Sequence, residues 1–191
     1  MDSARPSASC RVLVLVACLG IFSQELHAGD GDGQIDDAAK FFSAEAVSEA
    51  NDIVRAIESL YERDVRVETY DEVPDALKDD LARDGREKFY DDWLNRRAKA
   101  LGVRGVFVLI TRTPGRVQVG VDKATQRRAF TADDTDALRE ALVTAFRAGR
   151  HDRGLVDGLR FVRRRLDENT ARDRSAIVPV ARGRRDNPSR A

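Results

Sequence analysis

Acidic side chains stand next to several predicted ends of helices and strands, where a protein readily gathers ligands for a cation. Asp36 and Asp37 precede a predicted helix, Asp71 follows a predicted strand, and Asp122 ends a predicted hairpin. Calcium prefers oxygen ligands, and α/β proteins collect ligand sites at strand ends. The four residues are therefore candidate metal ligands, with Ca²⁺ as the candidate cation. The alternative is that they are ordinary capping and turn residues.

These residues suggest one kind of catalysis, in which a bound cation assists the hydrolysis of a phosphate ester. The sequence lacks a Gly-x-Ser-x-Gly nucleophile motif and a glycine-rich phosphate loop. Its two cysteines, Cys10 and Cys18, lie near the N-terminus. His151 stands at a predicted helix start, which favours capping or simple exposure over general-base catalysis. The residues leave the enzyme question open and lean toward a protein without catalytic activity.

A further acidic segment, Asp30 to Gly33, has the composition of an EF-hand calcium loop but not its ligands. In that register the first ligand position is Ala28 and the twelfth is Ala39. The twelfth position of an EF-hand is a glutamate that supplies two oxygens to the ion. We therefore interpret residues 29–34 as a solvated linker.

Three arginines form a second candidate site, for a phosphate group or an acidic partner: Arg104, Arg127 and Arg128. The alternative is a solvated basic face. The formal net charge of the whole chain is +0, so its charge gives no reason to expect nucleic-acid binding. The charges are unevenly distributed, with 20 acidic and 11 basic side chains in residues 29–103 but 9 and 14 in residues 104–170. The two halves either neutralise each other or form a bipolar surface that recruits a partner.

The N-terminus has the pattern of an export signal. Two arginines precede the apolar run Val12–Phe22, which is too short to span a bilayer comfortably. A short polar stretch then leads to Ala28, and we expect cleavage after this residue, so that residues 1–28 are a signal peptide. Two alternatives are a lipoprotein attached through Cys18 and an uncleaved membrane anchor. Cleavage predicts an extracytoplasmic protein, periplasmic or secreted, whereas the two alternatives predict a protein attached to the membrane. We expect an envelope or membrane protein as its partner.

Hydrophobic periodicity predicts alternating helices and strands over residues 35–170. Apolar residues at three-four spacing predict helices, and alternating or continuous β-branched runs predict strands. The expected order is α-β-α-β-β-α-α, which indicates a three-layer α/β/α sandwich around a small mixed sheet. The arginine-rich residues 171–191 have no apolar period and are predicted to be a disordered tail. The expected helices are 43–63, 75–101 with a break near Gly85, 131–148 and 151–169; the expected strands are 65–70, 106–111 and 117–121.

An ordered series of motifs over residues 35–166 resembles the TPM domain family. The series comprises IDDAAKFFSAEA, VRVETYDEVP, FYDDWLNRRAKALGVRGVFVLITR, VQVGV and LVTAFRAGRHDRGLVDGL. The resemblance implies an exported or thylakoid-lumenal α/β/α domain, often tethered to a membrane. Some members of the family are described as acid phosphatases, some bind calcium, and some act in photosystem II repair or as receptor-associated proteins.

The sequence departs from the family pattern at two places that bear on a site. Val103-Arg104 stands where many members have an Asp-Asn pair, and residues 122–128 replace a glycine-rich loop. Both changes make a metal or phosphatase site of the family type less well supported here. The sequence therefore predicts an exported accessory or interaction module of the cell envelope. The alternative is a divalent-cation-binding, acid-phosphatase-like hydrolase.

Overall fold

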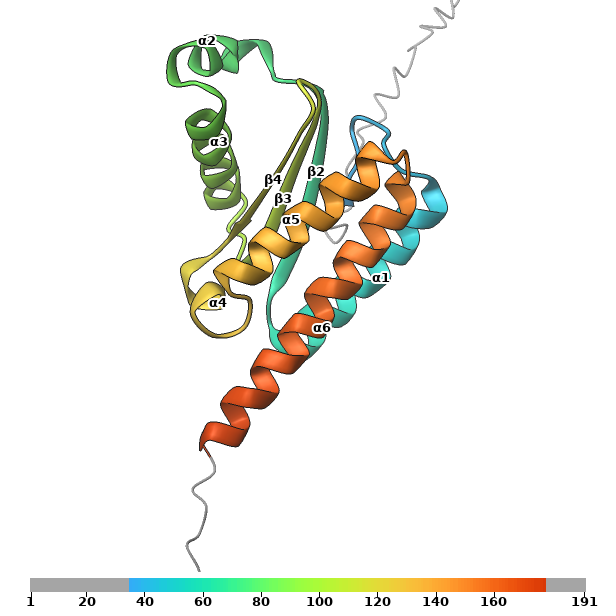
Figure 1. Cartoon of the computed structure of the whole chain (residues 1–191), viewed down its shortest axis with the longest axis vertical. Helices are drawn as coiled ribbons and strands as arrows, with labels where there is room; N and C mark the ends of the chain where they lie inside the picture. Colours follow the sequence, from blue (N-terminus) through green and yellow to red (C-terminus); the bar gives the residue numbers. More distant parts are fainter. Residues whose placement is uncertain (1–34, 178–191) are drawn as a thin grey trace, which may run out of the picture.

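The computed structural model describes residues 35–177, with side-chain surroundings up to residue 172. The predicted signal peptide, the linker and residues 178–191 of the predicted tail lie outside the described residues. The elements are β1 (Ile35–Asp36), α1 (Ala44–Tyr61), β2 (Asp64–Glu72), α2 (Asp75–Asp84), α3 (Arg86–Ala100), β3 (Gly105–Thr113), β4 (Arg116–Val121), α4 (Lys123–Arg128), α5 (Ala132–Arg147) and α6 (His151–Ile177) (Figure 1).

The four strands form one mixed sheet in the order β1-β2-β3-β4. The first three strands are parallel, and β4 returns antiparallel to β3. The carboxyl ends of β1, β2 and β3 therefore point toward the same end of the sheet. We call this end the upper edge. The start of β2, the start of β3 and the end of β4 share the opposite edge, which we call the lower edge.

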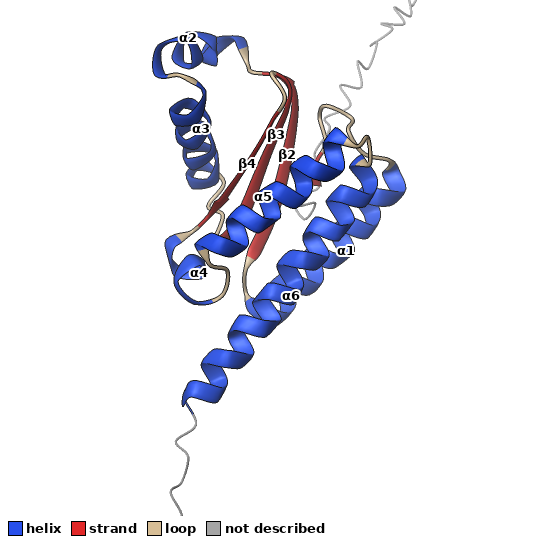
Figure 2. Ribbon diagram, in the orientation of Figure 1, coloured by secondary structure: helices blue, strands red, loops and turns tan. Residues whose placement is uncertain are grey.

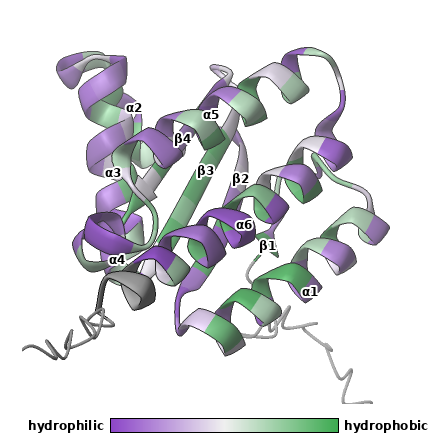
Figure 3. Cartoon of the chain, turned by 60° about the horizontal axis from the view of Figure 1, so that its bottom comes forward, coloured by the Kyte–Doolittle hydropathy of each residue, from purple (hydrophilic) through white to green (hydrophobic). Residues whose placement is uncertain are grey.

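Helices cover both faces of this sheet, with α3 on one face and α1, α5 and α6 on the other (Figures 1 and 2). Alternate residues of β3 enter the two cores. Val108 and Ile110 pack with the three-helix side, whereas Phe107 and Leu109 pack with the aromatic residues of α3. Figure 3 shows β3 as a hydrophobic strand between these layers. The predicted three-layer sandwich with a doubly covered central strand is confirmed.

Local capping sets the helix boundaries where the sequence predicts them. The Ser43 hydroxyl accepts a hydrogen bond from the Ala46 amide, 3.2 Å away, and begins α1. Gly85 has a positive φ of 74° and separates α2 from α3, as glycine readily does. Thr131 begins α5 with a capping box.

Three features differ from the predicted elements. Ile35 and Asp36 form a short edge strand, β1, that no periodicity could indicate. Residues 123–128, expected as a loop, form the helix α4, because Asp122 caps their amides. The helix α6 continues to Ile177, past the predicted end at Asn169 and into the segment predicted to be a disordered tail. Within residues 35–177, no helix is long and apolar enough to cross a membrane.

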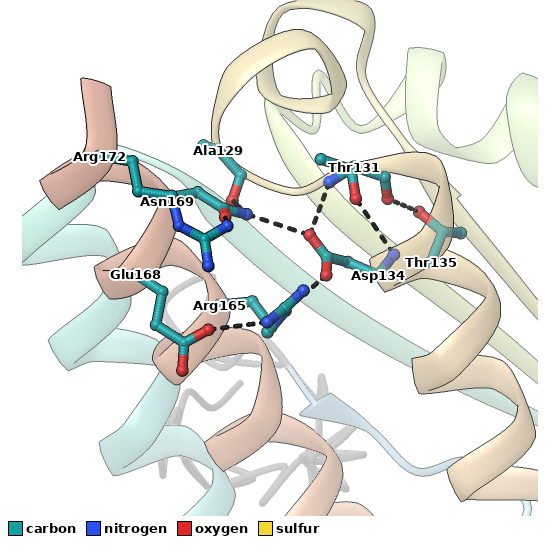
Figure 4. Close-up of polar contacts among 8 residues, drawn as sticks. All are labelled: Ala129, Thr131, Asp134, Thr135, Arg165, Glu168, Asn169 and Arg172. Carbon is teal, nitrogen blue, oxygen red and sulfur yellow. Dashed lines mark hydrogen bonds and ion pairs between the residues drawn. The ribbon is translucent and has the colours of Figure 1, made fainter. Parts of the chain in front are cut away.

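A buried polar network joins the start of α5 to α6 (Figure 4). Asp134, whose side chain is 1% exposed, accepts hydrogen bonds from the Thr131 amide, from Arg165 and from Asn169. Asn169 also donates to the carbonyl oxygen of Ala129, 3.0 Å away. These contacts fix α5 against α6 and hold the loop between α4 and α5.

Candidate functional site

A cleft of about 800 Å³ opens at the upper edge of the sheet, between the start of α3, the β3–β4 hairpin and the C-terminal half of α5. This is the edge where α/β folds most often bind ligands. Its lining residues are Phe41, Arg86, Glu87, Ile110, Thr111, Arg112, Gly115, Arg116, Val117, Arg139, Glu140, Val143, Phe146, Arg147 and His151. The lining thus combines apolar residues with five arginines, one histidine and two glutamates.

Aromatic residues from three separate segments form the apolar part of the cleft. The ring of His151 lies 5.6 Å from the ring of Phe41 and 5.4 Å from that of Phe146. The guanidinium of Arg112 lies over the Phe41 ring, 4.6 Å from its centre, in a cation–π contact. His151, which the sequence assigned to capping or exposure, therefore belongs to the cleft wall.

The arginines of the cleft differ in whether they form ion pairs or hydrogen bonds with other residues of this chain. Arg116 forms a two-pronged ion pair with Glu87, at 2.7 and 2.6 Å. The hydrogen bonds from Arg116 hold the pKa of Glu87 below its usual value, so this carboxylate stays ionised and paired. Arg139 pairs with the exposed Asp136 at 2.7 Å. The guanidinium of Arg147 has no hydrogen bond or ion pair with any described residue, so it is free to receive an anion.

The loop that carries Phe41 into the cleft is built on Asp37. One carboxylate oxygen of Asp37 accepts from the Phe41 amide at 2.9 Å and from the Thr69 hydroxyl at 2.7 Å. Its other oxygen accepts from the Phe42 amide at 2.8 Å. Both oxygens of this candidate metal ligand therefore hold the backbone of the loop.

Arg112 connects this loop to a second candidate ligand, Asp71. It donates to the carbonyl oxygen of Ala39 at 2.6 Å and pairs with Asp71 at 2.9 Å. Asp37 and Asp71 thus lie at the same edge, with a guanidinium bonded to the Asp37 loop and to Asp71. Asp36 pairs with Glu68, in the middle of β2.

Asp122 lies at the lower edge, away from the other three candidate ligands. It follows Val121, which pairs with Val106 near the start of β3, whereas Thr111 pairs with Tyr70 near the end of β2. Five residues of β3 separate the two positions, which is roughly 16 Å. Asp122 caps α4 by accepting from the Ala124 amide at 2.9 Å. The structure therefore does not bring the four carboxylates together.

Calcium binding by the upper-edge carboxylates stays a prediction. Among the described residues, no group of three or more histidine, cysteine, aspartate or glutamate side chains is arranged to hold a metal ion. Arg104, Arg127 and Arg128 lie at the lower edge, with Asp122, and are exposed. They take no part in the cleft, and their role in binding an anion also stays a prediction.

A charged cluster between the sheet and α3 was not predicted from the sequence. Glu68, 1% exposed, accepts two hydrogen bonds from Arg97, at 2.6 and 2.9 Å, and one from the Tyr70 hydroxyl at 2.8 Å. Burial and the hydrogen bond to Glu68 raise the pKa of Tyr70. The one signal in the sequence was the charged residue Glu68 within the strand β2, since a charge that becomes buried needs a partner. The cluster fastens α3 to β2.

The family comparison agrees with the motif series. The sequence model of the TPM domain matches residues 35–165, which is more than half of the chain. The chain belongs to the TPM domain family. The match spans every strand of the sheet and all but the last part of α6, so the cleft lies inside this TPM domain.

A solved structure has the same fold at low sequence identity. The N-terminal domain of a P. gingivalis protein, determined by NMR, superposes with a TM-score of 0.57 at 21% identity, covering 73% of this chain and 85% of that one. The BA42 protein of Bizionia argentinensis reaches a TM-score of 0.48 at 20% identity, covering 69% and 86%. A comparison with curated proteins gives no match.

Proposed function

We propose that this TPM domain is a non-catalytic interaction module of the cell envelope, and that its upper-edge cleft binds an acidic segment of a partner protein that also carries an aromatic side chain. The observation that supports this most directly is the composition of the cleft. Five arginines surround an apolar wall that contains Phe41 and Phe146. Such a surface complements carboxylates and an aromatic ring in one ligand.

The energetics favour a carboxylate ligand at Arg147. A guanidinium donates two parallel hydrogen bonds to a carboxylate, and these are stronger than bonds between neutral groups. Arg139 lies two helical turns before Arg147 on the same face of α5, and it can exchange its exposed partner Asp136 for a ligand carboxylate. An aromatic side chain of the ligand would contact Phe146 and His151, where ring contacts add to burial.

The hydrolase alternative has less support from the positions of the carboxylates. Metal-assisted hydrolysis needs several oxygen ligands directed at one ion. Asp37 instead binds the amides of its own loop, and Asp122 caps a helix at the other edge. Export remains part of the proposal, since the predicted signal peptide lies outside the described residues.

A labelled probe peptide of alternating glutamate and phenylalanine tests the proposal. We expect the Arg139→Gln/Arg147→Gln variant to bind this probe at least about tenfold more weakly than the unmodified chain, because each lost charge-assisted hydrogen bond removes roughly 1.5 to 3 kcal/mol. Fluorescence anisotropy measures the affinity. Urea unfolding of the same variant checks that it is folded.

The matched control is Arg55→Gln/Arg160→Gln, which removes two exposed arginines on α1 and α6, outside the cleft. This control should bind like the unmodified chain. An equal loss in both variants would mean that the probe senses net charge alone, and the proposal would fail. Calcium-dependent hydrolysis of p-nitrophenyl phosphate by the unmodified chain would support the hydrolase instead.

A further inference from the structure

The lower edge of the sheet carries a second cationic surface, separate from the cleft. Backbone contacts bring its parts together there. The amide of Asp64 donates to the carbonyl oxygen of Arg104 at 3.2 Å, and the amide of Asp122 donates to that of Gly105 at 3.0 Å. Gly105, which follows Arg104, is therefore hydrogen-bonded to Asp122, which precedes α4. The C-terminal end of α3 lies at the same end of the molecule (Figures 1 and 3).

Five cations and one apolar residue make up what we call the basal patch: Lys99, Leu101, Arg104, Lys123, Arg127 and Arg128. All six are exposed. None of the five cationic groups has an ion pair or side-chain hydrogen bond with a described residue. Two carboxylates lie beside the patch and bind backbone amides: Asp64 accepts from the Arg104 amide at 2.6 Å, and Asp122 caps α4. Figure 3 shows α4 as strongly hydrophilic.

Leu101 is an exposed apolar side chain within this cationic surface. Within the described part of the chain, the large apolar side chains classed as exposed are Leu60, at 57%, and Leu101, at 36%. Leu60 stands at the end of α1 between the exposed acids Glu58 and Glu62, whereas Leu101 stands between Lys99 and Arg104. Of these two leucines, Leu101 is the one that stands between basic residues in the sequence.

From this arrangement we propose that the basal patch docks the domain on an anionic lipid surface. Basic residues near such a surface are attracted by its negative potential, and an apolar side chain among them enters the headgroup boundary. The charges are spread over the ends of α3 and α4 rather than gathered around a groove, which suits a lipid surface better than a single phosphate. The upper-edge cleft, at the opposite edge, then faces away from the lipid. The inference does not depend on the proposed function of the cleft.

Vesicle co-sedimentation of the full chain tests the docking. We expect more binding to vesicles of phosphatidylglycerol and phosphatidylcholine than to phosphatidylcholine alone, and less binding as salt is added. Each basic residue near an anionic surface contributes roughly a fivefold increase in partition. The variant Arg104→Gln/Arg127→Gln/Arg128→Gln should therefore lose roughly a hundredfold. Residues 1–34 and 178–191 are the same in every variant, so the difference reports the patch.

Two matched controls make the result decisive. Arg55→Gln/Arg150→Gln/Arg153→Gln removes the same charge from exposed positions outside the patch and should keep its partition within a few-fold. Leu101→Asn should weaken binding to the anionic vesicles, whereas Leu60→Asn should not. Equal losses in the two arginine variants, or equal effects of the two leucine variants, would overturn the proposal. Binding by the unmodified chain that is the same on neutral and anionic vesicles would overturn it as well.

Discussion

Replacing Asp134 with alanine is expected to lower the free energy of unfolding by about 3 kcal/mol, because breaking a buried ion pair leaves the remaining groups without their partner. Asp134 is fully enclosed and serves Thr131, Arg165 and Asn169 together. The loss removes the capping box as well as the contact between α5 and α6. We place the effect at the lower end of the usual range because Arg165 is 31% exposed and can turn toward water. Urea unfolding measures the change.

The neighbouring residue provides the control for this prediction. Asp133 lies in the same first turn of α5 but is exposed. Asp133→Ala loses only a favourable interaction with the helix dipole, which is about 0.3 to 1 kcal/mol. If the two alanine variants were equally stable, the buried network would not hold α5 and α6 together.

The pH dependence of stability gives a second readout of the same residue. Burial alone would raise the pKa of Asp134, but hydrogen bonds from Thr131, Arg165 and Asn169 outweigh it and hold this pKa below the usual value. A carboxyl group with a lowered pKa in the folded state stabilises the fold fully above the pKa of the unfolded chain, about 3.9. This contribution is lost as the pH falls through the folded value. Asp134→Asn should therefore flatten the acid limb of the stability curve.

Gly105→Ala is expected to destabilise the domain by about 3 kcal/mol or more, because overpacking against backbone cannot be relieved by turning a side chain. An added Cβ at Gly105 would lie 2.0 Å from the carbonyl oxygen of Asp64. Gly105 pairs with Asp64 where β2 and β3 begin, so the two strands would have to separate there. Thermal and urea denaturation measure the loss.

Alanine substitutions at two other glycines serve as comparisons for Gly105→Ala. At Gly120 a Cβ would meet a terminal methyl of Leu94 at 2.3 Å, and a side chain can shift, so Gly120→Ala should cost less. At Gly115 the nearest atom is the Arg112 carbonyl oxygen at 3.6 Å, which is an ordinary contact, so Gly115→Ala should be close to neutral. Equal stability of the Gly105 and Gly115 variants would contradict the close strand approach.

Features that depend on a few neighbouring residues could be predicted from the sequence. Ser43, Gly85 and Thr131 act through hydrogen bonds or φ angles within one turn, so the residue type alone indicates the helix boundary. The apolar run of β3 indicates a strand covered on both faces. In contrast, β1 exists through its pairing with β2, and two residues have no period to detect.

The candidate site was harder to predict from the sequence, because it depends on strand direction and on segments that are far apart in the chain. Asp122 falls at the edge opposite Asp71 because β2 runs parallel to β3 and β4 returns antiparallel to it. The sequence predicted the β3–β4 hairpin but not the direction of β2 relative to β3. The four-residue spacing of Arg139, Val143 and Arg147 does indicate a shared helix face. No sequence pattern shows that this face lies opposite the start of α3, which comes from a segment more than fifty residues earlier.

Mapping the binding of the glutamate–phenylalanine probe by NMR tests the central claim most directly. A titration of the ¹⁵N-labelled full chain reports each backbone amide separately. We predict saturable shifts at amides that line the cleft, such as those of Phe41, Gly115, Phe146 and His151, with little change at the lower edge. Shifts centred on α4 and Arg104, or shifts that do not saturate, would contradict binding in the cleft.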